Sequence, residues 1–357
     1  MGEFARKRPY VCILRTRDAE LKGFGELSAL IKDHLLPLIE YAKSRRTPKN
    51  PDGSVAVCVQ KIEALLEDRP YIADVTTMSS LSNAETERLL DQTNGFRAWR
   101  TFVVTLLSPN AIPVVHLTDP LDPASVAAQC ETFAGRGSGH VAVRIPPAYE
   151  QLDDLKSVLK KELGSLSKVY LVCDAEYINK KTAPLAAVGA QTTLLAAGAE
   201  FAELIVASSS FPSSVVLPDY GQDAYGKFPL REVGLSESLQ RIRGLEGVIH
   251  GDYALIHPVD FEGIVTNWVP RVDVPLDLDI FYHRYRRDDG GYERAAKAAF
   301  ADKDYAPIAC WAHENIKSAA GGAVQGRSPA HWIAVRVNLH ITRQVLRILS
   351  TNARRKF

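Results

Sequence analysis

The chain of 357 residues is long enough for one large α/β barrel or for two smaller domains, and its 46% hydrophobic and 24% charged residues give an ordinary globular balance. The formal net charge of +1 provides no overall field that would attract nucleic acid or a membrane, so only a local basic patch could bind nucleic acid. No apolar run approaches the roughly 20 residues that a membrane helix needs, and we expect no membrane partner.

Short, continuous apolar runs recur along residues 1–257, and nearly every run ends in a polar or ionisable residue. Continuous rather than alternating apolar runs are typical of strands that are buried on both faces. In chain order, the runs predict eight strands at residues 10–17, 36–41, 71–75, 112–117, 140–145, 169–174, 203–207 and 247–256. Mostly helical spans separate these strands, at residues 20–34, 55–67, 83–92, 124–133, 149–163, 183–197 and 236–245.

The spacing of the strand ends predicts a closed parallel barrel. Successive ends lie 25 to 42 residues apart, which fits the βα units of a right-handed parallel sheet. Eight such units in about 250 residues match the size of a (β/α)8 TIM-like barrel, an α/β fold. An open doubly wound sheet is the alternative, but the sequence has neither a G-x-G-x-x-G motif after the first strand nor a Walker motif. We therefore predict a barrel over residues 1–257.

Residues 258–357 do not continue the repeat, and we predict that they form a C-terminal extension packed on the barrel mouth. The segment 282–287 mixes basic and aromatic side chains, which could grip a nucleic-acid backbone and stack on bases. The alternative is a solvated surface segment paired with the aspartates that follow it. If the extension leans over the mouth, Tyr282, Arg284 and Arg336 contribute to the same site.

The cysteines and the N-terminus predict a cytoplasmic protein. The five cysteines are widely scattered and odd in number, and no two of them form a C-x-x-C pair. This pattern argues for reduced thiols and against a zinc site or a disulfide framework. Residues 1–9 contain no apolar segment of the kind found in a secretory signal.

Several blocks carry a resemblance to a known family. The first strand, the acidic start of the helix after it and residues 36–40 resemble the opening of the phage and bacterial "beta protein" family. The later segments 252–253, 282–285 and 332–340 are similar to that family's C-terminal blocks, so the resemblance spans essentially the whole chain. It implies a phage-associated or bacterial context and brings no activity with it; the hydrolase considered below would act there in phage–host conflict or antiviral defence.

The predicted strand ends gather polar residues at one face of the barrel, where the active sites of such barrels lie. A histidine among carboxylates can act as a general acid or base near neutral pH, and arginines bind phosphate through paired hydrogen bonds. We therefore expect catalytic roles for Glu40, Asp74, His116 and Asp174. We expect substrate-binding roles for Arg15, Arg144, Ser208, Tyr253, Tyr282, Arg284 and Arg336.

Two classes of function fit this ring of residues. The first is a hydrolase that acts on a phosphate ester, a nucleotide or a nucleic acid, with no cofactor identified and Mg²⁺ on the carboxylates as the candidate metal. The second is a non-catalytic module that captures a ligand or a protein partner with the same charged mouth. Convergence of the carboxylates and His116 around an ion favours the enzyme. Mutual pairing of arginines and carboxylates favours the module.

Overall fold

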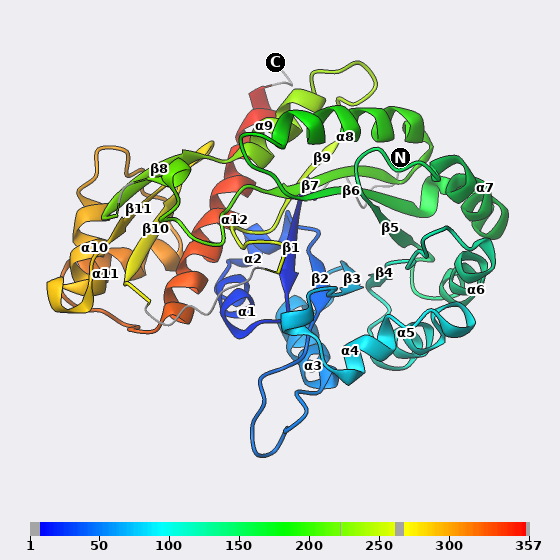
Figure 1. Ribbon diagram of the computed structural model, residues 1–357, viewed down its shortest axis with the longest axis horizontal. Coiled ribbons are helices and arrows are strands. Elements are labelled where there is room, and N and C mark those ends of the chain that lie inside the picture. The colour runs from blue at the N-terminus through cyan, green and yellow to red at the C-terminus, as the bar shows by residue number, and fades with distance from the viewer. Residues whose placement is uncertain (1–7, 222, 261–267, 355–357) are drawn as a thin grey trace.

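The computed structural model of the chain describes residues 8–221, 223–260 and 268–354. Eight parallel strands form the barrel, in the order β4-β3-β2-β1-β9-β7-β6-β5 (Figure 1). A bridge between Val114 and Ala142 joins the two ends of this order, and the Val115 amide donates a hydrogen bond of 2.8 Å to the Ala142 carbonyl. The predicted (β/α)8 TIM-like barrel is confirmed. Its strands are β1 (Tyr10–Arg15), β2 (Leu38–Tyr41), β3 (Tyr71–Val75), β4 (Ala111–Pro113), β5 (Val141–Ile145), β6 (Val169–Tyr177), β7 (Glu203–Ser209) and β9 (Ile249–Asp252).

Helices surround the barrel and cover the outer faces of its strands. They are α1 (Asp18–Gly25), α2 (Ala29–Asp33), α3 (Val55–Leu66), α4 (Ala84–Leu89), α5 (Thr93–Leu106), α6 (Pro123–Ala134), α7 (Leu152–Leu163), α8 (Ala183–Ala197) and α9 (Arg231–Leu239). Short 3-10 helices lie at η1 (Ser79–Leu81), η2 (Leu166–Lys168), η3 (Gly198–Glu200), η4 (Pro218–Tyr220) and η5 (Arg287–Asp289). In the described part of the chain, no helix has both the length and the apolar composition needed to cross a bilayer.

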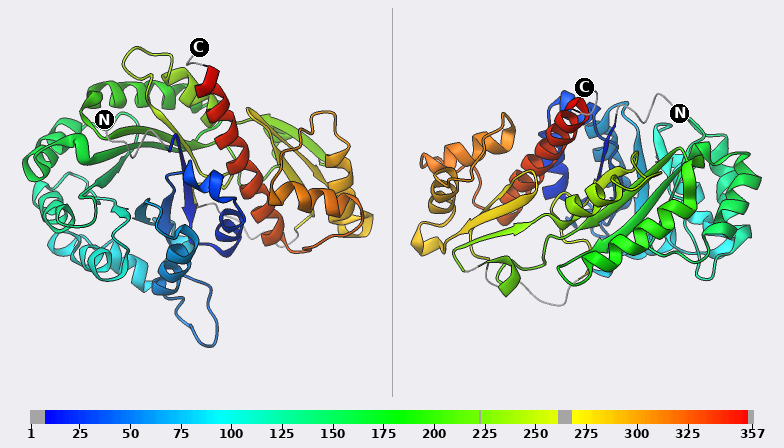
Figure 2. Two further views of the ribbon diagram at one scale, coloured as in Figure 1. Left: turned by 180° about the vertical axis from the view of Figure 1, so that it is seen from behind. Right: turned by 90° about the horizontal axis from the view of Figure 1, so that it is seen from above.

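A second, antiparallel sheet lies beside the barrel (Figures 1 and 2). This side sheet has the order β10-β11-β8, with β8 (Tyr225–Pro229), β10 (Arg271–Pro275) and β11 (Asp279–Arg284). Helices α10 (Gly291–Phe300) and α11 (Trp311–Ala320) pack together next to it. Strand β8 lies between β7 and β9 in the sequence but pairs with β11 instead of joining the barrel. Residues on both sides of position 257 therefore share the side sheet.

The long helix α12 (Pro329–Arg354) joins the two parts of the molecule. It packs against α1 and β1 of the barrel and against β10 of the side sheet, and so lies where the eighth barrel helix is expected. One set of its apolar residues belongs to the barrel core, namely Val337, Ile341 and Val345. Another set belongs to the core of the side sheet, namely Trp332, Val335 and Leu339. The helix is therefore part of both cores rather than a loose tail.

The first turn of α5 is left-handed and directs a ring toward the barrel mouth. Asn94, Gly95 and Phe96 have φ values of 53°, 64° and 54°, a region that costs a bulky residue energy. Arg100 holds this turn by donating hydrogen bonds from Nε to the Gly95 carbonyl, at 2.9 Å, and from Nη2 to the Asn94 carbonyl, at 2.7 Å. The turn brings the Phe96 ring edge-to-face against the His116 ring, with centroids 5.4 Å apart.

We expect Gly95→Ala to lower the free energy of unfolding by about 1–2 kcal/mol, the cost of a left-handed conformation for a residue with a Cβ. The added Cβ would also lie 3.0 Å from the Cβ of Ala128. Gly135→Ala is the control, because Gly135 has φ −83° and nothing within 4 Å of an added Cβ. Urea unfolding should separate the two variants. Equal midpoints would show that the left-handed turn carries no such cost.

Candidate functional site

Alternate residues of each barrel strand face the interior, and this alternation selects the side chains at the mouth. In β1, Val11 and Ile13 pack inside the barrel, whereas Cys12 and Leu14 pack outside against the helices. By the same alternation, Arg15 also faces the interior, at the C-terminal end of β1. Applied to the other strands, it also places these side chains at the mouth: Glu40, Asp74, His116, Arg144, Asp174 and Tyr253.

Arg144 lies at the centre of this ring and is fully engaged by it. Its Nε and Nη2 contact Asp174 Oδ2 at 2.8 and 2.7 Å, and Nη2 donates to the Tyr253 hydroxyl at 2.6 Å. Its Nη1 donates to Glu40 Oε1 at 2.7 Å and to Asp74 Oδ2 at 2.9 Å. A guanidinium has five N–H donors, so these five contacts leave none of them for a ligand.

Three of the five N–H donors of Arg15 are engaged, and a loop covers the side chain. Its Nε pairs with Glu40 Oε2 at 3.0 Å, while Nη1 and Nη2 donate to the carbonyls of His257 and Pro258 at 3.1 and 2.6 Å. The loop after β9, residues 253–260, therefore crosses this side of the mouth. Its last residue, Asp260, accepts hydrogen bonds from the Ser79 and Ser80 hydroxyls of η1. Arg15 and Glu40 are buried as a result.

His116 is held by partners on three sides. Its Nε2 lies 3.1 Å from Asp74 Oδ1, its ring stacks on Trp99 with centroids 4.9 Å apart, and its backbone exchanges hydrogen bonds with the Gln129 amide. Burial opposes ionisation of Asp74, but the hydrogen bond from His116 and the charge of Arg144 outweigh it and lower the pKa of Asp74 to about 2. Asp74 is therefore ionised at neutral pH, and the pair is preformed.

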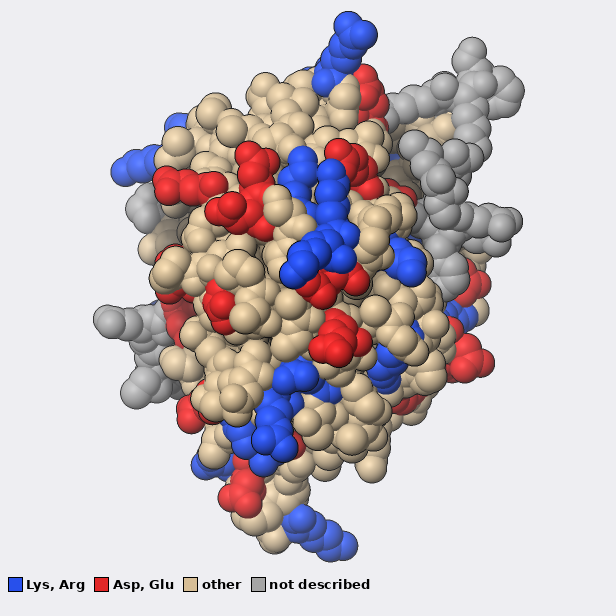
Figure 3. All heavy atoms as spheres, turned by 90° about the vertical axis from the view of Figure 1, so that its right-hand side faces the viewer, with Lys and Arg blue, Asp and Glu red and all other residues tan. Residues whose placement is uncertain are grey.

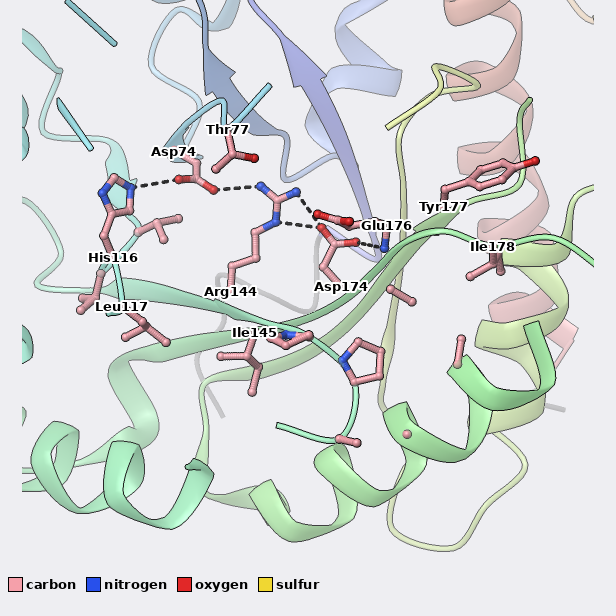
Figure 4. Close-up of a pocket in the computed structure, with 18 of the residues that line it drawn as sticks. Asp74, Thr77, His116, Leu117, Arg144, Ile145, Asp174, Glu176, Tyr177 and Ile178 are labelled. Atoms are coloured by element: carbon pink, nitrogen blue, oxygen red, sulfur yellow. Dashed lines mark hydrogen bonds and ion pairs between the residues drawn. The ribbon is translucent and has the colours of Figure 1, made fainter. Parts of the chain in front are cut away.

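An open cavity of about 1020 Å³ lies beside the ring, between the C-terminal ends of β3 to β6 and helix α8. Asp74, His116, Arg144 and Asp174 line one side of it. In Figure 4, Arg144 lies between Asp74 and Asp174, and His116 lies beyond Asp74. The remaining wall is mostly apolar, formed among others by Leu117, Ile145, Pro146, Pro147, Leu185 and Val188. The cavity thus combines a charged, internally paired floor with an apolar wall.

Glu176 also lines this cavity, and it was not among the predicted site residues. Strand β6 continues past its predicted end at Asp174, and its pairing with β7 shifts register between Asp174 and Tyr177. Within this bulge Glu176 adopts φ 49°, and its side chain is exposed. Bulges next to functional sites commonly re-aim a side chain, and positive φ at a non-glycine residue marks a position held under strain. Desolvation raises the pKa of Glu176, and the nearby Asp174 carboxylate adds to the rise.

The other predicted site residues do not line the cavity. Ser208 follows Ala207, which faces the barrel interior, and so it points outward; its buried hydroxyl has no partner among the residues described. Tyr282 donates to the Val215 carbonyl at 3.1 Å, Arg284 pairs with Asp223, and Arg336 is buried against Asp273 at 2.8 Å. The expectation that these three join the barrel-mouth site is not met, because each makes its contacts at or beside the side sheet.

The carboxylates are not arranged as a metal site. Over the residues that the structure describes, no group of three His, Cys, Asp or Glu residues could hold a metal ion. Both oxygens of Glu40 contact arginines, Asp74 accepts from His116 and Arg144, and Asp174 accepts from Arg144 and the Glu176 amide. A Mg²⁺ ion would have to displace these contacts, so the residues do not fit the metal that the sequence suggested.

Charges of both signs are interspersed on the face shown in Figure 3, which includes α7. On α7, Lys160 pairs with Glu200 at 2.5 Å and Lys161 with Glu162 at 3.3 Å. A nucleic-acid backbone binds a stripe of unneutralised basic residues. Among the described residues of this face, acidic side chains lie between the basic ones, so these residues do not form such a stripe.

Comparison with known proteins places the chain in a family. The profile of the family described as Beta protein matches residues 10–346. The chain is 32% identical over 343 residues to Protein beta of Enterobacteria phage P4, and the alignment covers 94% of this chain and 92% of that protein. No solved structure is significantly similar to the chain. The match runs through the whole barrel, the side sheet and most of α12, and the chain therefore belongs to the Beta protein family.

Proposed function

We propose that the barrel mouth binds a small organic molecule, and that the charged ring shapes the floor of this site without taking part in covalent chemistry. One observation carries the proposal: an open cavity of about 1020 Å³ with an apolar wall adjoins a ring in which Arg144 is satisfied by its own neighbours. A cavity of about this size, largely apolar with a few polar groups, is typical of small-molecule sites. The mutual pairing of Arg144, Glu40, Asp74 and Asp174 is the pattern expected of a binding module.

A phosphoester hydrolase is the second candidate. The 3.1 Å contact between His116 and Asp74 at the edge of the cavity favours it, because a carboxylate can orient a histidine for proton transfer. Against it, the two arginines expected to bind phosphate are engaged elsewhere: Arg144 spends its five N–H donors on the ring, and Arg15 spends three and lies under the loop of residues 253–260. The unpaired Nδ1 of His116 is also buried rather than exposed to the cavity. Turnover of bis(4-nitrophenyl) phosphate by the purified chain would reverse this preference.

We expect Val188→Trp to abolish binding of small aromatic probes. Val188 lies on α8, is 63% exposed and lines the cavity, so an indole there should fill the mouth without disturbing the core. Leu195→Trp is the matched control, since Leu195 is exposed on the same helix but does not line the cavity. Saturation-transfer NMR with phenethylamine, 2-phenylethanol and 3-phenylpropionate measures binding. The proposal fails if no probe binds the native chain, or if binding survives Val188→Trp.

A further inference from the structure

We propose that the ligand of the barrel mouth carries an ammonium group, which Glu176 binds, next to an apolar body that packs against α8. This inference rests on the proposed function, because it specifies the ligand of the same cavity. It is carried by the charge of the cavity lining, by its unused hydrogen-bond acceptors and by the arrangement of its apolar and aromatic walls.

The lining of the cavity is negatively charged. The ionisable residues of fixed charge that line it are Asp74, Asp174, Glu176 and Arg144. Three carboxylates therefore face one guanidinium, and Arg144 is the one lysine or arginine among the described lining residues. Behind them Arg15 and Glu40 pair with each other and add no net charge. A cation gains free energy on entering such a site, whereas a phosphate or carboxylate ligand would be repelled.

Unused acceptors point to the same ligand chemistry. The oxygens of Asp74 and Asp174 accept hydrogen bonds from the protein, but among the described residues no side chain or amide donates to the Glu176 carboxylate. An ammonium group has three donors and no acceptor, so it complements a site that offers acceptors.

The walls fit an amine with an apolar body. On α8, Leu185 and Val188 are 76% and 63% exposed, and both line the cavity, so ligand binding would cover apolar surface that now faces water. Phe96 and Tyr177 also line the cavity, and aromatic faces attract cations. The Tyr177 hydroxyl bonds to that of Tyr220 at 2.6 Å, which fixes the position of the ring. Desolvation raises the pKa of Glu176, which means that the ionised form is disfavoured. A ligand with a positive charge would stabilise that ionised form.

Affinities of phenethylamine, 2-phenylethanol and 3-phenylpropionate for the full chain test the inference, because the three probes share a phenyl ring and differ in charge. We expect the amine to bind at least about tenfold more tightly than the alcohol, and the carboxylate to bind most weakly, as a charge-assisted hydrogen bond predicts. Glu176→Gln should remove the preference for the amine and leave the affinity for the alcohol within about twofold. Glu131→Gln, on the exposed surface of α6, makes the same change in net charge away from the cavity and should leave the preference intact.

The outcomes separate this inference from the proposed function. Equal binding of amine and alcohol to the native chain, or a preference for the carboxylate, overturns the ammonium site while leaving a ligand-binding cavity. If Glu176→Gln binds none of the three probes, the ammonium site is also overturned, because Glu176 would then maintain the shape of the bulge rather than bind an ammonium group. Thermal unfolding of each variant verifies that the fold is retained. If none of the three probes binds the native chain, the proposed function itself is wrong.

Discussion

Replacing Arg144 with methionine is expected to lower the free energy of unfolding by about 3–5 kcal/mol, the cost of removing one partner from a buried ionic network. Without the guanidinium, Glu40, Asp74 and Asp174 would face one another at the barrel mouth with their main counter-charge gone. All three carboxylates are buried, so water cannot readily take the place of the guanidinium in stabilising their charges. Methionine keeps most of the side-chain length and removes the donors and the charge.

Urea unfolding monitored by circular dichroism at pH 7 measures this loss. Arg97→Met is the matched control, since Arg97 is exposed on α5 and makes no ion pair with a described residue. An Arg144 variant as stable as the control would mean that the ring does not support the fold. The binding proposal would then lose its argument that the charges serve structure, and a catalytic ring would become the better interpretation.

The alternation of residues along the strands explains how much of the site could be predicted from the sequence. Each continuous apolar run identified a strand, and its terminal charged residue identified a mouth position, as for Glu40 on β2 and Asp74 on β3. Ser208 is the exception, because it follows the inward-facing Ala207 and points outward. Both faces of β7 are buried, so the sequence does not show which set of alternate residues faces the interior.

Other features depend on contacts that no local pattern encodes. Residue Glu176 was missed because a bulge in β6 leaves no signature in the run Val169–Tyr177, whose apolar part ends at Cys173, just before Asp174. Strand β8 pairs with β11, about 50 residues further along the chain, so its partner could not be inferred from spacing. The covering of Arg15 by the loop of residues 253–260 is likewise a tertiary contact. These long-range contacts decide which ring residues remain open to a ligand.

The same ring makes stability depend on pH through a neighbouring carboxyl. Glu20 of α1 is 5% exposed and accepts a hydrogen bond of 2.7 Å from the Arg15 amide. Burial raises the pKa of Glu20 to about 7, although the charge of Arg15 opposes the rise. The folded chain therefore prefers the protonated acid, whereas the unfolded chain ionises Glu20 near pH 4.5. The resulting stabilisation is complete below about pH 4.5 and is lost as the pH rises to about 7.

Glu20→Gln is accordingly expected to stabilise the chain at pH 8 by up to about 3 kcal/mol and to change little at pH 4, because the amide never ionises and its oxygen can still accept from Arg15. Unfolding free energies of both chains, measured by urea titration from pH 4 to pH 8, should diverge as the pH rises. Glu26→Gln, on the exposed end of the same helix, should follow the native curve throughout. A variant less stable than the native chain at pH 8 would show that the ionised form of Glu20 is the one the fold requires, with Arg15 as its true counter-ion.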